Sequence, residues 1–294
     1  MKQFWKTVRS LTKKESSVPT LHHDGATAST SGEKACMLND FFASCFNPSL
    51  EPLNQDDRQS SNLQPSTCPL DHYCTEEEVL TLIQSLDASK ASGPDGISIR
   101  MLKGTAASIA PSLTLLFNIS IGNSCFPNCW KKSFVVPIPK ASAHDSPTNY
   151  RPISLLSVVS KLLERHIHFL LTSHLDENDP ISEQQWGYQQ GKSTVTSLLT
   201  IIHDWLRILE SGREVCSIFF DLKKAFDSVS HRPLMAKLEK TGLSPHLQEW
   251  IRSYLTDRQQ RVVVGGEASH DNPVLSGVPQ GSVLGPFAFP SIYQ

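Results

Sequence analysis

The feature that most constrains the fold is a short apolar run that ends in a carboxylate. Residues 215–221 read VCSIFFD, an almost unbroken series of β-branched and aromatic side chains followed by an acid. A run of this length without polar alternation is typical of a strand buried on both faces of a sheet. We therefore expect a sheet covered by helices, with Asp221 at the accessible end of one strand.

Helical spacing of apolar residues predicts the layers that cover such a sheet. The clearest case begins at Thr75, where Thr75 and Glu78 have the spacing of a capping box and an apolar stripe continues to Leu86. The segment 90–96 (KASGPDG) ends this helix in a turn. Further helices are predicted over residues 109–119, 158–170, 195–209, 230–242 and 244–255.

Strand character appears in three further segments. Residues 134–140 (FVVPIPK) alternate β-forming residues with prolines, which exclude a central strand, so we expect an edge strand or an exposed loop. Residues 259–265 and 273–278 have the pattern of two hairpin arms. The second arm leads into the glycine-rich segment 276–286 (SGVPQGSVLGP).

The N-terminal part has the composition of a linker. Residues 24–32 and 54–69 are rich in Ser, Thr, Asn, Asp and Pro and lack periodic apolar residues. The first seventy residues are therefore expected to be loosely ordered and loosely attached to the rest.

Overall composition excludes several classes of protein. With 294 residues, 39% of them hydrophobic, and 27 basic against 29 acidic groups, the chain is neither a histone-like polycation nor fully disordered. No apolar run has the length of a membrane-spanning helix, and the seven scattered cysteines predict neither a disulfide framework nor a zinc site. We expect a cytoplasmic or nuclear protein that is not secreted and has no membrane partner.

The acids that follow the apolar run are the first candidates for chemistry. Asp221 at a strand end can bind Mg²⁺ together with a backbone carbonyl, and Asp227 follows six residues later. An Asp at the end of a strand is also a common turn or helix cap. On the residues alone, both interpretations stay open.

Two segments that contain glycine are candidate ligand-binding loops. Residues 191–194 (GKST) resemble the end of a P-loop, but Trp186 stands where that motif needs glycine, which favours a simple loop that enters a helix at Thr194. Residues 276–286 carry three glycines and two prolines around Gln280. They predict a tight, irregular turn whose backbone can approach a planar ligand closely.

A basic segment is the candidate nucleic-acid surface. Residues 130–170 carry six positive charges against Asp145 and Glu164, an excess that favours a surface facing phosphates. A solvated helix face is an equally good explanation on charge alone. The six residues are Lys131, Lys132, Lys140, Arg151, Lys161 and Arg165.

Taken together, these segments resemble a known family. In their order along the chain they are similar to the reverse transcriptases of non-LTR, LINE-type retrotransposons, particularly the jockey-like group. The similar blocks are residues 90–97, 135–140, 149–165, 185–194, 219–231 and 276–286. The resemblance implies an α+β, right-hand polymerase fold with helical fingers, an incomplete antiparallel palm sheet and no thumb. It assigns residues 1–70 to a connector of the kind that follows an endonuclease, 71–213 to the fingers and 214–294 to a partial palm.

The same resemblance implies nucleotidyl transfer with two Mg²⁺ ions. Asp221 matches the first metal-binding carboxylate of the family, and the carbonyl of Leu222 matches its companion ligand. Phe226 matches the bulky residue that abuts the sugar and excludes a 2′-hydroxyl. These assignments come from the family and not from the spacing of the residues.

Four further residues match positions that contact the nucleotide. Lys140 and Arg151 match cations that face the incoming triphosphate, and Gln280 and Gly281 match the turn beneath the nucleotide and the template base. The implied partners are an RNA template, a DNA primer and deoxynucleoside triphosphates. The residues expected to contact nucleic acid are Lys131, Lys132, Lys161 and Arg165.

The chain departs from the family pattern near its end. The family's other two metal-binding aspartates lie in a [FY]-x-D-D hairpin beyond the glycine-rich turn, and here no Asp follows Asp271. Pro290 stands where the family has an apolar helix, at a cost of about 3 kcal/mol in a helix interior. We predict little or no polymerase activity from this chain alone. A non-catalytic nucleic-acid-binding remnant is the alternative, and a P-loop nucleotide hydrolase is a third hypothesis.

Overall fold

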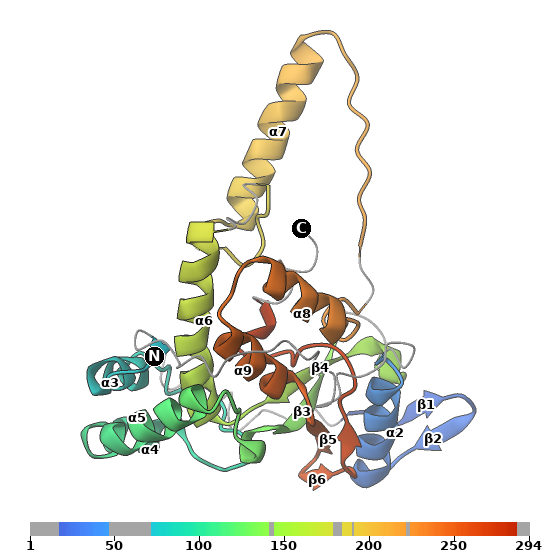
Figure 1. Cartoon of the computed structure of the whole chain (residues 1–294). Helices are drawn as coiled ribbons and strands as arrows, with labels where there is room; N and C mark the ends of the chain where they lie inside the picture. The colour runs from blue at the N-terminus through green and yellow to red at the C-terminus, as the bar shows by residue number, and fades with distance from the viewer. Residues whose placement is uncertain are drawn as a thin grey trace, which may run out of the picture.

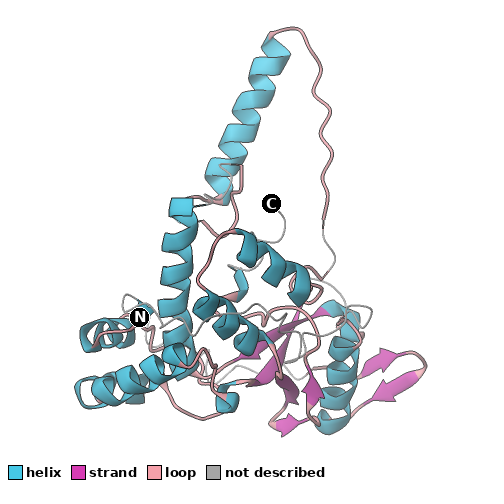
Figure 2. Cartoon of the chain, in the orientation of Figure 1, coloured by secondary structure: helices cyan, strands magenta, loops and turns pink. Residues whose placement is uncertain are grey.

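The computed structural model describes residues 18–46, 72–140, 144–178, 184–189, 191–221 and 224–286. Helices and strands are both present and form a mixed α+β structure (Figures 1 and 2), as the sequence predicts. Buried apolar side chains form two clusters. The larger one lies among the helices, and the smaller one lies between an N-terminal helix and the sheet.

Eight α-helices lie in the described part of the chain. The predicted capping box is confirmed, because the Thr75 side chain accepts from the Glu78 N–H at 3.2 Å while the Glu78 carboxylate accepts from the Thr75 N–H at 2.8 Å. The five further helical segments predicted from apolar spacing and caps are helical too. The helices are α2 (Ser31–Ala43), α3 (Glu76–Gln84), α4 (Ile99–Gly104), α5 (Ala106–Gly122), α6 (Val158–Asn178), α7 (Thr194–Glu210), α8 (His231–Lys240) and α9 (Pro245–Leu255).

The larger core cluster is built from α3, α5, α6, α8 and α9. Phe126 lies at its centre and makes edge-to-face contacts with Trp250 at 5.5 Å and Tyr254 at 5.1 Å between ring centroids. The apolar stripe of α9 is buried in full. On α5, helical spacing predicts a buried face through Leu113, Leu116 and Ile119, but Leu116 and Ile119 are exposed. The buried face is rotated because the small residues of this helix also pack inward.

The main sheet is mixed, with the strand order β4-β3-β5-β6, and β7 pairs with β5. β3 runs antiparallel to β4 but parallel to β5, so the sheet as a whole is mixed, whereas within residues 214–294 β5 pairs antiparallel with both β6 and β7. A parallel pair needs a long connection, and helices α6 to α9 supply it between β4 and β5. The strands are β3 (Lys132–Pro139), β4 (Tyr150–Leu155), β5 (Gln259–Val264), β6 (Glu267–Ala268) and β7 (Asn272–Pro273). The predicted hairpin arm at 273–278 is therefore shorter than expected.

β3 is also not an edge strand, contrary to the prediction. Its first half, Lys132 to Val135, pairs with β5, while residues 134–139 pair with β4. Pro137 and Pro139 lie in the half that has a neighbour on one side only. Proline lacks an N–H to donate, so it is tolerated there at no cost in ladder hydrogen bonds.

Residues 18–46 are not loosely attached, which corrects the prediction for this part of the N-terminal seventy residues. Strands β1 (Leu21–His23) and β2 (Ala26–Ala28) form a hairpin, and α2 packs on β5 beside it (Figure 1). Leu38 and Phe42 of α2 are buried in the smaller core cluster with Val135 and Val262 of the sheet. The predicted linker 24–32 is a hairpin turn followed by the capping box of α2. The whole of the second predicted linker, 54–69, lies outside the described residues.

The run 215–221 is not a strand in this structure, which contradicts the first prediction. Residues 213–221 have no secondary structure, and Phe219 and Phe220 are 83% and 90% exposed. Figure 1 shows this segment returning from the far end of α7, which projects away from the other helices. A strand needs a neighbouring strand, and the described residues provide none beside this run.

Membrane spans and disulfides can be judged for the described residues alone. No helix among them is long and apolar enough to cross a membrane. The six cysteines that the described ranges contain are free thiols. Burial raises the pKa of the Cys74 thiol to about 12, which keeps it protonated.

Candidate functional site

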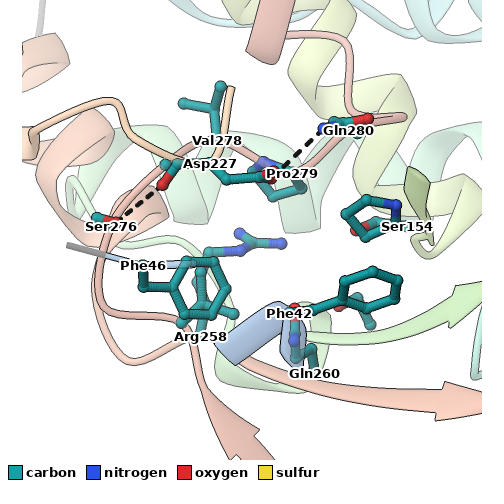
Figure 3. A pocket seen from close by; sticks show the side chains of 14 residues that line it. Phe42, Phe46, Ser154, Asp227, Arg258, Gln260, Ser276, Val278, Pro279 and Gln280 are labelled. Atoms are coloured by element: carbon teal, nitrogen blue, oxygen red, sulfur yellow. Dashed lines mark hydrogen bonds between the residues drawn. The ribbon is translucent and has the colours of Figure 1, made fainter. Parts of the chain in front are cut away.

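The glycine-rich turn 276–286 is bound tightly to the segment that follows the apolar run. The N–H of Gly277 donates to the Val229 carbonyl at 2.8 Å, and the N–H of Val278 donates to the Phe226 carbonyl at 2.9 Å. The Ser276 hydroxyl donates to the Asp227 carbonyl at 2.9 Å (Figure 3). The two most distinctive motifs of the sequence therefore form one structural unit.

Glycine is required at two places where this turn meets other backbone. Gly277 has φ of +79°, and a Cβ built there would lie 2.6 Å from the Phe226 carbonyl oxygen. Gly281 has φ of +118°, and a Cβ there would lie 2.6 Å from the Ser154 carbonyl oxygen. Side chains have no room at either position, and both backbone conformations favour glycine. The turn thus lies directly against both the 224–230 segment and β4.

The side chains of Asp227 and Gln280 face each other across this contact. The Gln280 amide nitrogen donates to Asp227 Oδ1 at 3.4 Å, and the Gln280 carbonyl accepts from the Ser154 N–H at 2.7 Å. Burial raises the pKa of the Asp227 carboxyl, and this hydrogen bond and the positive charges of Lys224 and Lys140 oppose the rise. The predicted residue Gln280 is therefore held by its side-chain amide on one side and by its backbone carbonyl on the other.

A buried carboxylate on α6 fixes the end of the turn. Glu164 is fully buried and accepts from the Val283 N–H at 2.8 Å, from the Ser160 hydroxyl at 3.2 Å and from the Tyr254 hydroxyl at 3.4 Å. Burial raises the pKa of Glu164, and the Val283 N–H is the largest influence in the other direction. In the sequence, Glu164 is recognisable only as one negative charge in the basic segment, because its neighbours give no sign that this acid is buried.

A buried imidazole supports the start of the turn. His231, the first residue of α8, donates through Nε2 to the Gly277 carbonyl at 2.7 Å. Burial is the largest influence on this imidazole and lowers its pKa, which favours the neutral ring. α8 and α6 therefore hold the turn from two sides.

Phe226 lies at the edge of the larger core cluster, partly buried. Its ring makes an edge-to-face contact with Tyr188 at 6.0 Å between centroids. Tyr188 belongs to the QWGYQQGKST segment, so a third predicted motif meets the other two at this ring. The ring lies next to Asp227 in the chain and beside the glycine-rich turn.

The two predicted triphosphate cations lie on neighbouring strands. Lys140 follows β3, and its backbone N–H donates to the Asn149 carbonyl at 2.7 Å, while Arg151 on β4 is paired with Ile138. Both side chains are exposed. The Lys140 ammonium donates to the Thr148 carbonyl at 2.8 Å and acts electrostatically on Asp227. Lys140 therefore lies near enough to act on the carboxylate that contacts the glycine-rich turn.

Of the two predicted metal ligands, Asp221 alone lies in the described residues. Asp221 is exposed and lies in the segment without secondary structure, and Leu222 lies outside the described residues. Across the described ranges, no three His, Cys, Asp or Glu side chains lie close enough together to hold a metal ion. The described side chains therefore form no cluster that holds Mg²⁺ by itself.

The residues predicted to contact nucleic acid differ in exposure. Lys131 is 4% exposed, and burial lowers its pKa, as it also does for Lys161. Arg165 on α6 donates to the Ser85 hydroxyl at 3.1 Å, next to α3. Lys132 is exposed on β3. Lys132, Lys140 and Arg151 are the members of the basic segment whose side chains are exposed.

The GKST segment contains no phosphate-binding loop in this structure. Ser193 caps α7 by accepting from the Thr196 N–H at 3.1 Å, as a simple entry to a helix predicts. The Lys192 ammonium donates to the Gln185 carbonyl at 2.9 Å and lies 5.4 Å from the Trp186 ring centroid. Lys192 thus contacts its own loop.

Comparison with known proteins identifies the family to which these motifs belong. Residues 138–294 match the family model described as reverse transcriptase (RNA-dependent DNA polymerase). In Drosophila melanogaster, the probable RNA-directed DNA polymerase from transposon BS is 35% identical over 72% of this chain and 24% of its own length. The RNA-directed DNA polymerase from mobile element jockey is 34% identical over 72% of this chain and 23% of its own length.

A third relative matches almost the whole chain. The probable RNA-directed DNA polymerase from transposon X-element of Drosophila melanogaster is 30% identical over 97% of this chain and 32% of its own length. The chain thus spans about a quarter to a third of the length of these relatives. The motifs that meet at the glycine-rich turn lie within the region that the family model matches. The chain therefore belongs to the reverse transcriptase family, as a jockey-like member of the non-LTR retrotransposon type.

Proposed function

We propose that this chain is the fingers and part of the palm of an RNA-directed DNA polymerase, with residues 71–213 in the fingers and 214–294 in the palm. The observation that carries the proposal is the contact of Gln280 with Asp227, which joins the glycine-rich turn to the segment containing Phe226. The proposed substrates are deoxynucleoside triphosphates, and the proposed partners are an RNA template and a DNA primer. A cytoplasmic or nuclear location goes with this role.

Three groups of residues have distinct roles in the proposal. Phe226, braced by Tyr188, limits the space beside the sugar of an incoming nucleotide. Lys140 and Arg151 bind its triphosphate, the first as a point charge and the second through paired N–H donors. Gln280 and Gly281 pack beneath the base, where Gly281 lets the backbone of the turn lie close against the Ser154 carbonyl.

Reverse transcriptases as a family depend on a divalent metal, and we propose Mg²⁺ with Asp221 and the Leu222 carbonyl among its ligands. Asp221 is exposed in the described residues, and the Asp227 carboxylate accepts from the Gln280 amide. We therefore propose that this chain alone incorporates little or no nucleotide.

Nucleotide binding tests the proposed nucleotide site, and primer extension tests the proposed lack of activity. Isothermal titration with a deoxynucleoside triphosphate should show binding that is weakened in Lys140→Ala and Arg151→Ala, with Lys34→Ala, which lies on α2, as the matched control. Primer extension on an RNA template with Mg²⁺ should show little or no product. Extension that Asp221→Ala abolishes would overturn the proposed inactivity, and unchanged binding in both variants would overturn the proposed nucleotide site.

A second candidate is a non-catalytic nucleic-acid-binding remnant, and the exposure of Lys132, Lys140 and Arg151 favours it. Contacts to phosphates predict affinity for RNA that falls steeply with salt and ignores sequence. Fluorescence anisotropy across a salt series, with two unrelated RNA sequences, measures both properties. Salt-independent or sequence-selective binding would contradict this candidate.

A further inference from the structure

A pocket opens between α2 and the glycine-rich turn, and it contains a buried arginine. Phe42 and Phe46 form one wall, and the turn forms the opposite wall (Figure 3). Arg258, just before β5, reaches between these walls. Hydroxyl and amide groups complete the lining, from Ser133, Ser154, Gln260, Ser276 and Gln280. We refer to it as the Arg258 pocket.

The guanidinium of Arg258 is held firmly on one side. Its Nη1 donates to the Tyr254 carbonyl at 2.9 Å, and its carbon lies 4.8 Å from the Tyr254 ring centroid and 5.7 Å from that of Phe126. The residue is 3% exposed. Packing and the Nη1 hydrogen bond therefore fix the direction in which the other nitrogen points.

That other nitrogen has no acceptor. Arg258 Nη2 is buried and makes no hydrogen bond, and Arg258 takes part in none of the ion pairs found among the described residues. Glu164 influences Arg258 only electrostatically, because its oxygens accept from Val283, Ser160 and Tyr254 instead. A buried guanidinium nitrogen without an acceptor is costly, so the retention of Arg258 indicates that a ligand supplies an acceptor for Nη2.

From this arrangement we infer that the Arg258 pocket binds a phosphate group, with Arg258 Nη2 donating to one of its oxygens. A guanidinium N–H without a protein acceptor suits an anion with several acceptor oxygens. Asp227 also lines the pocket, and its Oδ1 accepts from Gln280. The inference deepens the proposed function, because the phosphate belongs either to a nucleic-acid backbone or to a free polyphosphate such as a nucleoside triphosphate or its product.

Thermal unfolding and titration calorimetry test this with three probes at constant ionic strength: inorganic phosphate, pyrophosphate and a short single-stranded RNA. Arg258→Met keeps the stem and removes the unpaired charge. It should unfold at a temperature at least as high as the wild type without ligand, and it should lose the stabilisation that phosphate groups give the wild type. Arg261→Met is the matched control, because Arg261 lies three residues along the chain and pairs with Asp271.

Arg258→Lys keeps a charge and much of the packing, so it carries the test if Arg258→Met does not fold. It should bind the probes at least about tenfold more weakly, since a hydrogen bond from a charged donor to phosphate is lost or lengthened. Stabilisation of the wild type by RNA alone identifies a strand backbone, and stabilisation by pyrophosphate identifies a free phosphate compound. Either result supports the inference.

Two outcomes separate this inference from the proposed function. If no probe stabilises the wild type, or if both Arg258 variants respond like Arg261→Met, the phosphate site is wrong. If pyrophosphate binds through Arg258 while the wild type binds neither RNA nor deoxynucleoside triphosphate, the site stands and the polymerase role fails.

Discussion

The fully buried carboxylate of Glu164 accepts a hydrogen bond from the backbone N–H of Val283 at 2.8 Å. These residues lie on α6 and at the end of the glycine-rich turn, more than a hundred positions apart in the chain. The same carboxylate also accepts from the Tyr254 hydroxyl on α9. One side chain thus joins the two helices to the turn that presents Gln280.

Glu164→Gln should flatten the dependence of stability on pH. Burial raises the pKa of Glu164, so the folded chain holds this proton more tightly than the unfolded chain does. The contribution to stability is complete below the ordinary pKa of glutamate and is lost as the pH rises through the higher folded pKa. Urea unfolding across acidic to neutral pH measures the slope, and equal slopes in both proteins would contradict the prediction. Glu164→Ala, which strands the Val283 N–H, should cost about 1–3 kcal/mol.

Gly277→Ala should destabilise the chain well beyond an ordinary glycine substitution. Backbone strain at a positive φ costs about 1–3 kcal/mol, and the new Cβ would also meet Asp227 Cα at 2.8 Å. Gly96→Ala is the matched control, because Gly96 has φ of +68° but nothing within 4 Å of its Cβ position. The difference between the two free energies of unfolding isolates the clash. Equal losses would mean that the turn does not lie against residues 226–227.

Chymotrypsin should cut first after Phe219 or Phe220. These side chains are 83% and 90% exposed in a segment without secondary structure, whereas Phe117 and Phe126 are fully buried. Backbone that lacks hydrogen bonds and packing fits a protease site most readily. Mass spectrometry of the early fragments identifies the bond. Protection of residues 213–221 at protease levels that cut elsewhere would show that the run is folded in solution.

Replacing the apolar stripe of α7 should improve solubility with little change in stability. Leu198, Ile202 and Leu206 are 57%, 47% and 53% exposed, and exposed apolar patches promote association. The triple change to Gln should reduce aggregation and alter the free energy of unfolding by about 0.5 kcal/mol or less per site. Light scattering and urea unfolding measure the two effects. A loss of about 2 kcal/mol per site would indicate that this face is buried in solution.

Local sequence signals predicted the elements whose causes are local. The helices that begin at Thr75 and Ser244 follow from caps and apolar stripes within one or two turns. The same holds for α7, which forms where apolar spacing predicts a helix, although none of its described side chains is buried. Amphipathic spacing therefore predicts that a helix forms, but not what covers it.

The errors in the sheet concern pairing between distant segments, whereas the error in the N-terminal part is one of composition. The place of β3 depends on β5, more than a hundred residues later, and no local pattern encodes that neighbour. The run 215–221 has strand composition but no partner strand among the described residues. In the N-terminal part, Ser and Thr looked like linker composition, whereas Thr30 is the cap of α2.

In the candidate site, the motif residues were predicted and the buried charged residues were not. Gln280, Gly281 and Phe226 were assigned by family resemblance, and the structure brings their segments together. Glu164 and Arg258 could not be predicted, since an isolated charged residue gives no sign that it will be buried. The roles of Asp221 and Leu222 stay predictions.

The packing of α2 on β5 bears on how the domain is produced for experiments. The family match begins at residue 138, yet Leu38 and Phe42 cover Val135 and Val262, and Phe46 closes one wall of the Arg258 pocket. An expression clone trimmed to the matched region would strip an apolar layer from the sheet and open that pocket. Boundaries for recombinant work therefore belong upstream of Val18.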